Sequence, residues 1–106
     1  MPTHYQITLC TCPDKKTAEK IAHLLVNDKL AACVNILPGI TSVYRWQEQT
    51  ESAQEYLLLI KANKSSYQTI ETTIKKHHPY ELPEIIAVPV ENGLPEYLHW
   101  IDSCHS

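Results

Sequence analysis

The chain has 106 residues, of which 43% are hydrophobic and 20% charged, and its formal net charge is −3. This length suits one hydrophobic core, and this composition is typical of a globular domain rather than a disordered chain. We therefore expect a single domain over residues 1–106. Basic residues gather only in pairs such as Lys15-Lys16, which argues against a nucleic-acid partner, because a phosphate backbone requires a basic stripe.

Targeting and cofactor-binding segments are also not evident in the sequence. Residues 1–4 show no positive region leading into an apolar run, and no apolar run approaches the roughly 20 residues that span a bilayer. We therefore expect a cytoplasmic protein without a membrane partner, whose four cysteines are free thiols. Two glycines, Gly39 and Gly93, are too few for a P-loop or a dinucleotide-binding loop.

The first half of the chain predicts a strand, a helix and a second, long strand. Residues 4–11 alternate as a strand does. A helix follows, because Pro13 and Asp14 suit its first turn and the apolar residues after them recur at helical spacing. Residues 31–46 are rich in β-branched and aromatic side chains and predict one long strand.

The second half predicts two further strands and two further helices. The strand at residues 55–61 is apolar on both faces, which is typical of a sheet centre covered on both sides. The predicted elements are a polar loop at 47–52, the strand at 55–61, a helix from Ser65 or Ser66 to His78, a strand at 84–90 and a short helix from Pro95.

The order β-α-β-β-α-β plus a short C-terminal helix predicts an α+β fold, the ferredoxin-like split βαβ arrangement. In that topology the first and third strands are central and the other two are edges. Proline cannot donate to a ladder and is confined to edges and bulges. Pro38 falls in the second predicted strand and Pro89 in the fourth, as the topology requires, and Pro38-Gly39 is expected to form a bulge or a bend rather than a full turn.

Two bare edge strands make an isolated subunit an aggregation hazard. The strand at residues 31–46 is also too long for two modest helices to cover. We expect these edges to pair with neighbouring subunits in a closed ring, which removes free edges without forming fibres. A monomer with a splayed hairpin is the alternative.

Three segments together resemble the CutA divalent-cation tolerance family. They are residues 31–46, with Ala-Ala-Cys-Val-Asn-Ile followed by Pro-Gly-Ile-Thr-Ser-Val-Tyr-Arg-Trp; residues 77–86, with His-His-Pro-Tyr-Glu-Leu-Pro-Glu-Ile-Ile; and residues 97–101, with Tyr-Leu-His-Trp-Ile. The resemblance implies a ferredoxin-like subunit in a compact homotrimer joined through edge strands, with an architecture like that of PII signalling proteins. It also implies a link with tolerance to divalent metals, copper above all, and no catalytic reaction.

Thiols and imidazoles are the side chains that suit copper and zinc. By the resemblance, Cys10, His77 and His78 match positions associated with copper binding in some members, and Glu55 matches a nearby acidic position. This implies copper (Cu2+) as the ligand, with zinc as the second choice. Adjacent helical residues point about 100° apart, so His77 and His78 share one metal only if the helix frays before Pro79. Alternatively, the two histidines stabilise the helix C-terminus.

The cysteines allow a second interpretation. Cys10 and Cys12 lie two apart in a predicted strand and share a face, but without a second such pair they do not specify a structural zinc site. Cys10 and Cys33 are alternatively small buried hydrophobic residues. The resemblance favours Cys10 over Cys12 as a ligand, and Cys104 and His105 belong to a tail without an expected role.

The leading functional hypothesis is a trimer that binds copper or a similar divalent ion in metal homeostasis. The second is a PII-like module that binds a small anionic ligand at subunit clefts, with Arg45 or Lys61 as its contacts. The third is a structural trimer that docks a partner protein. An enzyme is not expected, because no nucleophile elbow, HExxH or Cys/His motif occurs and the acid pair Glu81 and Glu84 is typical of a solvated surface.

Overall fold

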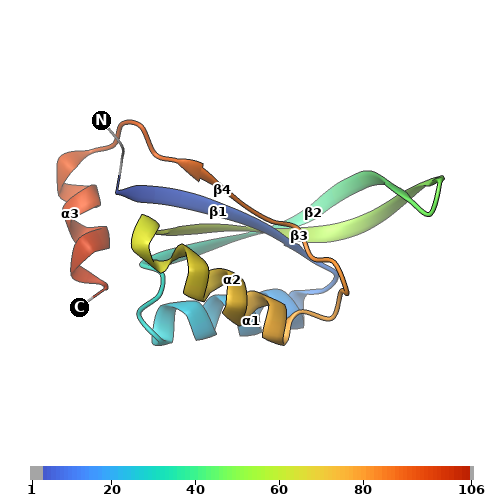
Figure 1. The fold of residues 1–106 in the computed structure, drawn as a ribbon, viewed down its shortest axis with the longest axis horizontal. Coiled ribbons are helices and arrows are strands. Elements are labelled where there is room, and N and C mark those ends of the chain that lie inside the picture. The colour runs from blue at the N-terminus through green and yellow to red at the C-terminus, as the bar shows by residue number, and fades with distance from the viewer. Residues whose placement is uncertain (1–3, 106) are drawn as a thin grey trace.

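The computed structural model describes residues 4–105 and has the predicted order of elements (Figure 1). The elements are β1 (Tyr5–Cys12), α1 (Lys15–Asn27), β2 (Cys33–Trp46), β3 (Gln49–Asn63), the 3-10 turn η1 (Lys64–Ser66), α2 (Tyr67–His77), β4 (Ile85–Pro89) and α3 (Pro95–Ser103). The first three residues, on which part of the targeting expectation rests, lie outside this range. Within the described range, no helix combines the length and the apolar character needed to cross a membrane.

The sheet confirms the ferredoxin-like topology. Its strand order is β2-β3-β1-β4, and each neighbouring pair is antiparallel. The central strands are therefore β1 and β3, and both prolines lie in edge strands, Pro38 in β2 and Pro89 at the end of β4. The distribution of prolines in the sequence was thus a valid guide to strand position.

Two helices, α1 and α2, cover one face of the sheet (Figure 1). Helix α1 begins where Asp14 accepts a 2.7 Å hydrogen bond from the backbone N–H of Thr17, which satisfies one of the unpaired donors of the first turn. The core between these helices and the sheet consists of Cys10, Cys12, Ala18, Ile21, Leu25, Ala31, Leu58, Ile60, Ala62, Ile70 and Ile74. Because neighbouring strand residues face opposite ways, Leu58 and Ile60 lie in this core and Leu59 lies on the other face.

The opposite face of the sheet, which we call the open face, carries Ile7 and Leu9 of β1 opposite Val88 and Ile86 of β4. Helix α3 packs at one end of the molecule, near the N-terminus, where Ile101 is buried and the Tyr5 hydroxyl donates a 2.7 Å hydrogen bond to Asp102 (Figure 1). The sequence predicts that both faces of β3 are covered. Within one chain the helices α1 and α2 cover only one of them, so the prediction is met on that face alone.

The hairpin of β2 and β3 projects well beyond the helices (Figure 1). The predicted bulge is confirmed, because the pairing register shifts between Leu37 and Ile40 and Gly39 has a φ of +73°. The predicted loop at 47–52 is wrong. Gln47 and Glu48, with φ values of 48° and 65°, alone form the turn, and β3 starts at Gln49. A two-residue turn with positive φ at both positions matches the twist of the flanking strands. The pairing of β2 with β3 therefore continues to the tip of the hairpin, although the side chains there are polar.

Helix α2 ends one residue earlier than predicted. It stops at His77, and His78 is extended with φ −92° and ψ 137°, because the residue before a proline avoids helical geometry. The chain after Ile101 continues the short C-terminal helix. Helix α3 runs to Ser103, and His105 Nε2 accepts a 3.1 Å hydrogen bond from the backbone N–H of Asn63. Burial lowers the pKa of His105, which suits this accepting role.

Candidate metal site

Two thiols lie at the end of β1. Cys10 and Cys12 occupy alternate positions of the strand, so both face the helices, and both are completely buried. This confirms that they share a face and that Cys10 is buried. Neither of them forms a disulfide, so both sulfurs are available as ligands.

His78 approaches these thiols because it has left helix α2. The residue is 8% exposed. Its Nε2 lies 2.7 Å from the carbonyl oxygen of Thr11, and its Nδ1 accepts a 3.1 Å hydrogen bond from the backbone N–H of Tyr80. An N–H can only donate, so Nδ1 carries no proton and Nε2–H donates to the Thr11 carbonyl. The imidazole is therefore held between two backbone groups.

Cys10, Cys12 and His78 together form a compact donor cluster. One ligand atom of each residue lies within 4.8 Å of the other two. Ligands that share one tetrahedral Zn2+ or Cu+ ion are separated by about 3.6–3.8 Å, given metal–ligand bonds of about 2.1–2.3 Å. A contraction of about 1 Å thus suffices for all three to bind one ion, provided that His78 gives up one of its backbone hydrogen bonds.

The two thiols are electrostatically unequal. The hydrogen bond from the Cys10 thiol lowers the pKa of Cys12, although burial opposes this effect. The same hydrogen bond, followed by burial, raises the pKa of Cys10. The thiolate is the form that binds a metal, and of the two thiols Cys12 is the one whose pKa is lowered.

Glu55 lies beside this cluster rather than in it. The carboxylate is 5% exposed, and its Oε2 accepts a 2.8 Å hydrogen bond from the Tyr80 hydroxyl. As a minor cause, its charge adds to the raised pKa of Cys10 and opposes the lowered pKa of Cys12. Tyr80 also packs against His78, with ring centroids 4.8 Å apart. One aromatic residue thus connects the buried carboxylate with the imidazole.

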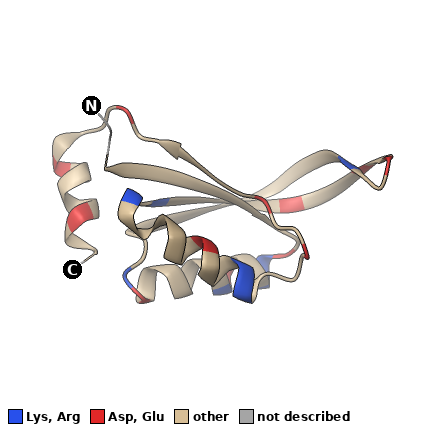
Figure 2. Cartoon of the chain, in the orientation of Figure 1, with Lys and Arg blue, Asp and Glu red and all other residues tan. Residues whose placement is uncertain are grey.

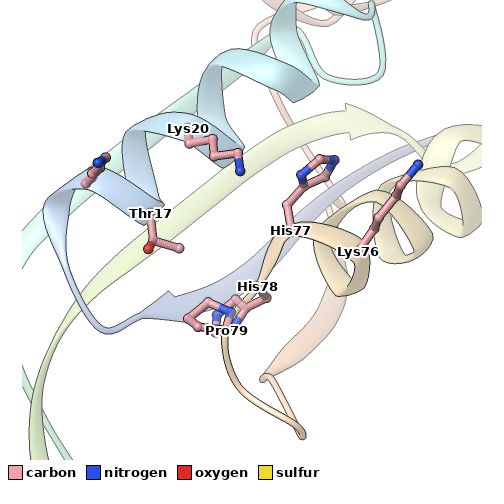
Figure 3. A pocket seen from close by; sticks show the side chains of 7 residues that line it. Thr17, Lys20, Lys76, His77, His78 and Pro79 are labelled. Carbon is pink, nitrogen blue, oxygen red and sulfur yellow. The ribbon is translucent and has the colours of Figure 1, made fainter.

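The structure separates the two adjacent histidines. His77 still belongs to α2 and lines an open cavity with Lys16, Lys20 and Lys76 (Figure 3). It is not a member of the donor cluster found among residues 4–105. The structure therefore brings Cys10 and His78 together and adds Cys12, which sequence reasoning had ranked below Cys10. The useful signal was the two-residue spacing of the thiols.

Other candidate residues lie elsewhere. Cys33 is only half-buried and faces Lys61, whose Nζ is 3.9 Å from the sulfur and hydrogen-bonds Asn35 Oδ1. Arg45 pairs with Thr50 near the hairpin tip, far along the ladder from Lys61. Within one chain these two cations do not form a common anion site.

The Tyr80–Glu55 contact predicts a measurable loss of stability. We expect Tyr80→Phe to lower the free energy of unfolding by about 2 kcal/mol, since it leaves a buried carboxylate without its hydrogen bond. The matched control is Tyr44→Phe, because Tyr44 is 45% exposed, and it should cost less than about 0.5 kcal/mol. Urea unfolding of both variants measures the difference. Equal losses would show that the Tyr80 hydroxyl contributes nothing specific.

The fold and this cluster define a small ferredoxin-like α+β protein with a buried thiol–imidazole site. The model of the CutA1 divalent ion tolerance protein family matches residues 6–104. A Yersinia pestis protein named divalent-cation tolerance protein CutA is 43% identical over 97 residues, which cover 92% of this chain and 82% of that protein. The chain belongs to the CutA1 divalent ion tolerance family, which is not known as a family of enzymes.

Solved structures agree with this assignment. The crystal structure of CutA from Xylella fastidiosa has a TM-score of 0.95 and 47% identity, and the alignment covers 98% of this chain and all (100%) of that one. The structure described as the periplasmic divalent cation tolerance protein CutA from Archaeoglobus fulgidus has a TM-score of 0.94 and 37% identity, with 96% and 99% coverage.

Proposed function

We propose that this protein is a homotrimer that binds copper, or a similar ion such as zinc, at Cys10, Cys12 and His78, and that it acts in metal tolerance without catalysing a reaction. The single observation that carries the proposal is the buried cluster, in which the three ligand atoms lie within 4.8 Å of one another. The family's link with divalent ions supports the same role.

The chemistry of the donors supports copper and zinc over harder ions. Sulfur and imidazole ligands favour copper and zinc, whereas magnesium and calcium prefer oxygen ligands. Cys12 supplies the first thiolate, and Cys10 loses its proton when the ion binds. His78 offers an imidazole nitrogen when it gives up its hydrogen bond with Thr11 or Tyr80. Three protein ligands leave a fourth position open, which suits an ion that must be released or transferred.

The surface of the sheet supports the trimer. The open face and its edges expose Leu37 at 38%, Ile86 at 54% and Val88 at 45%. The projecting hairpin adds further exposed apolar residues, Val43, Tyr44 and Trp46. Apolar edge strands are an aggregation hazard unless another chain covers them. We propose that β2 and β4 meet edges of neighbouring subunits in a closed ring.

We place the proposed activity in the cytoplasm. Cys10 and Cys12 act as ligands only while reduced, and a reducing compartment keeps such thiols free. The Archaeoglobus fulgidus relative is described as periplasmic. Fractionation of cells into cytoplasm and periplasm, followed by detection of this protein, tests the proposed compartment.

Native mass spectrometry of the metal-free protein, titrated with Zn2+ and with copper in the absence of oxygen, tests the proposal. We expect three chains of 12.1 kDa per assembly and one ion per chain. The variant Cys10→Ser/Cys12→Ser should keep the assembly and lose the ions, because serine does not replace a soft thiolate. Cys33→Ser/Cys104→Ser is the matched control and should bind as the unchanged protein does. Equal uptake by both variants would exclude the proposed site.

A further inference from the structure

A second site candidate lies on the helical side of the molecule. Where α1 begins and α2 ends, an open cavity of about 330 Å3 separates the two helices. Figure 3 shows Lys20 of α1 and His77 of α2 with their side-chain nitrogens directed toward the same space, and Lys76 beyond His77. The full lining is Lys16, Thr17, Lys20, Lys76, His77, His78 and Pro79.

The cavity concentrates positive charge on an acidic protein. The formal net charge of the chain is −3, yet three lysines line this cavity and no carboxylate does. Figure 2 shows blue basic segments together at this end of the helix pair. Like charges from two different elements repel one another, and a bound anion would relieve that repulsion.

Helix electrostatics explain only the α2 side. Basic residues in the last turn of α2 complement the negative end of its dipole. Lys16 lies in the first turn of α1, which contains no acidic residue, and a cation at the positive end of a dipole is unfavourable. Asp14 caps that turn, and the hydrogen bonds from Thr17 and, to a lesser extent, the Lys16 charge lower its pKa. It does not line the cavity. The dipole of α1 therefore does not account for Lys16, which has Asp14 as its nearby opposite charge.

We propose that this cavity binds a small multivalent anion of the phosphate class. Lysine ammonium groups bind phosphate oxygens as point charges, and Lys16 and Lys20 of α1 and Lys76 of α2 line the cavity. His77 adds ring nitrogens for a directional hydrogen bond. A volume of about 330 Å3 lies at the small end of ligand pockets, which suits an anion such as pyrophosphate better than a larger metabolite.

This site is independent of the proposed metal site. No cysteine lines the cavity, and the donor cluster contains none of the lysines. The two share only His78, whose ring is engaged by Thr11 and Tyr80. Anion binding should therefore persist in the Cys10→Ser/Cys12→Ser variant, so that failure of one proposal leaves the other intact.

Calorimetric titration with inorganic pyrophosphate at constant ionic strength is the test. We expect one anion per chain, and a dissociation constant raised about tenfold in Lys16→Gln/Lys20→Gln, because two charge-assisted contacts are lost. The control Lys29→Gln/Lys64→Gln removes the same charge from exposed lysines at the opposite ends of α1 and α2 and should bind normally. No binding, or equal weakening in both variants, would overturn the proposal.

Two further measurements complete the test. Citrate at the same concentration should bind more weakly than pyrophosphate, and tighter citrate binding would overturn the assignment to the phosphate class. In case the double variant does not fold, amide NMR shifts of the unchanged protein locate the anion. We expect pyrophosphate to move the signals of residues 15–20 and 75–78, and movement confined to other segments would contradict the site.

Discussion

Replacing His78 with glutamine is expected to weaken zinc and copper binding by about 100-fold or more, whereas His77→Gln leaves the affinity unchanged. His78 contributes one of three clustered ligand atoms, and structural metal sites lose most of their affinity when a ligand is removed. His77 faces the cavity between α1 and α2 instead. Competition with a chelator of known affinity measures both dissociation constants.

The two histidine variants are closely matched, since the residues are adjacent and the substitution is the same. Circular dichroism and thermal unfolding of each variant establish that a loss of affinity is not a loss of folding. Equal affinities of His78→Gln and His77→Gln would remove His78 from the site. A loss confined to His77→Gln would restore the assignment of His77 that the family resemblance implied.

The double substitution Ile86→Lys/Val88→Lys is expected to convert a trimer into monomers of 12.1 kDa. Both residues lie on the open face of edge strand β4 and are 54% and 45% exposed in the single chain. If a neighbouring subunit covers them, two buried and unpaired ammonium groups cost more than a subunit contact contributes. Sedimentation equilibrium at micromolar concentration measures the mass.

Val26→Lys is the control for this experiment. Val26 has a similar exposure, 40%, but lies on α1 on the other side of the sheet, so its substitution should leave the trimer intact. A mass of one chain for the unchanged protein would show that the edges are not used for assembly. A trimer that survives the β4 substitutions would show that its contacts lie elsewhere.

The end of α2 assigns two neighbouring histidines to different environments. Pro79 excludes His78 from helical geometry, so its ring turns into the sheet and meets the thiols of β1, while His77 keeps its helical direction and faces the lysines of α1. A single break of the helix thus lies between the proposed metal site and the proposed anion site. We expect Pro79→Ala to weaken metal binding more than anion binding.

Local patterns in the sequence determined the fold. The two-residue period of β1, the continuous apolar run of β3, the helical spacing in α1 and the order of elements suffice for the ferredoxin-like topology, because each pattern reports which sides of an element are buried. The prolines identified the edge strands, since a missing N–H is tolerated only there. The turn at Gln47 and Glu48 escaped prediction because neither residue is typical of positive φ.

Only the tertiary structure decided which ligands meet. The thiols of β1 and the imidazole after α2 are separated by more than 60 residues in the chain, and no local pattern reports how closely they pack. The exclusion of His77 depends on where α2 ends, and sequence patterns define the ends of helices less well than their existence. The lysine-lined cavity likewise arises from two helices that meet side by side. Residue type thus indicated the chemistry, whereas packing across the sheet and between the helices selected the residues that carry it.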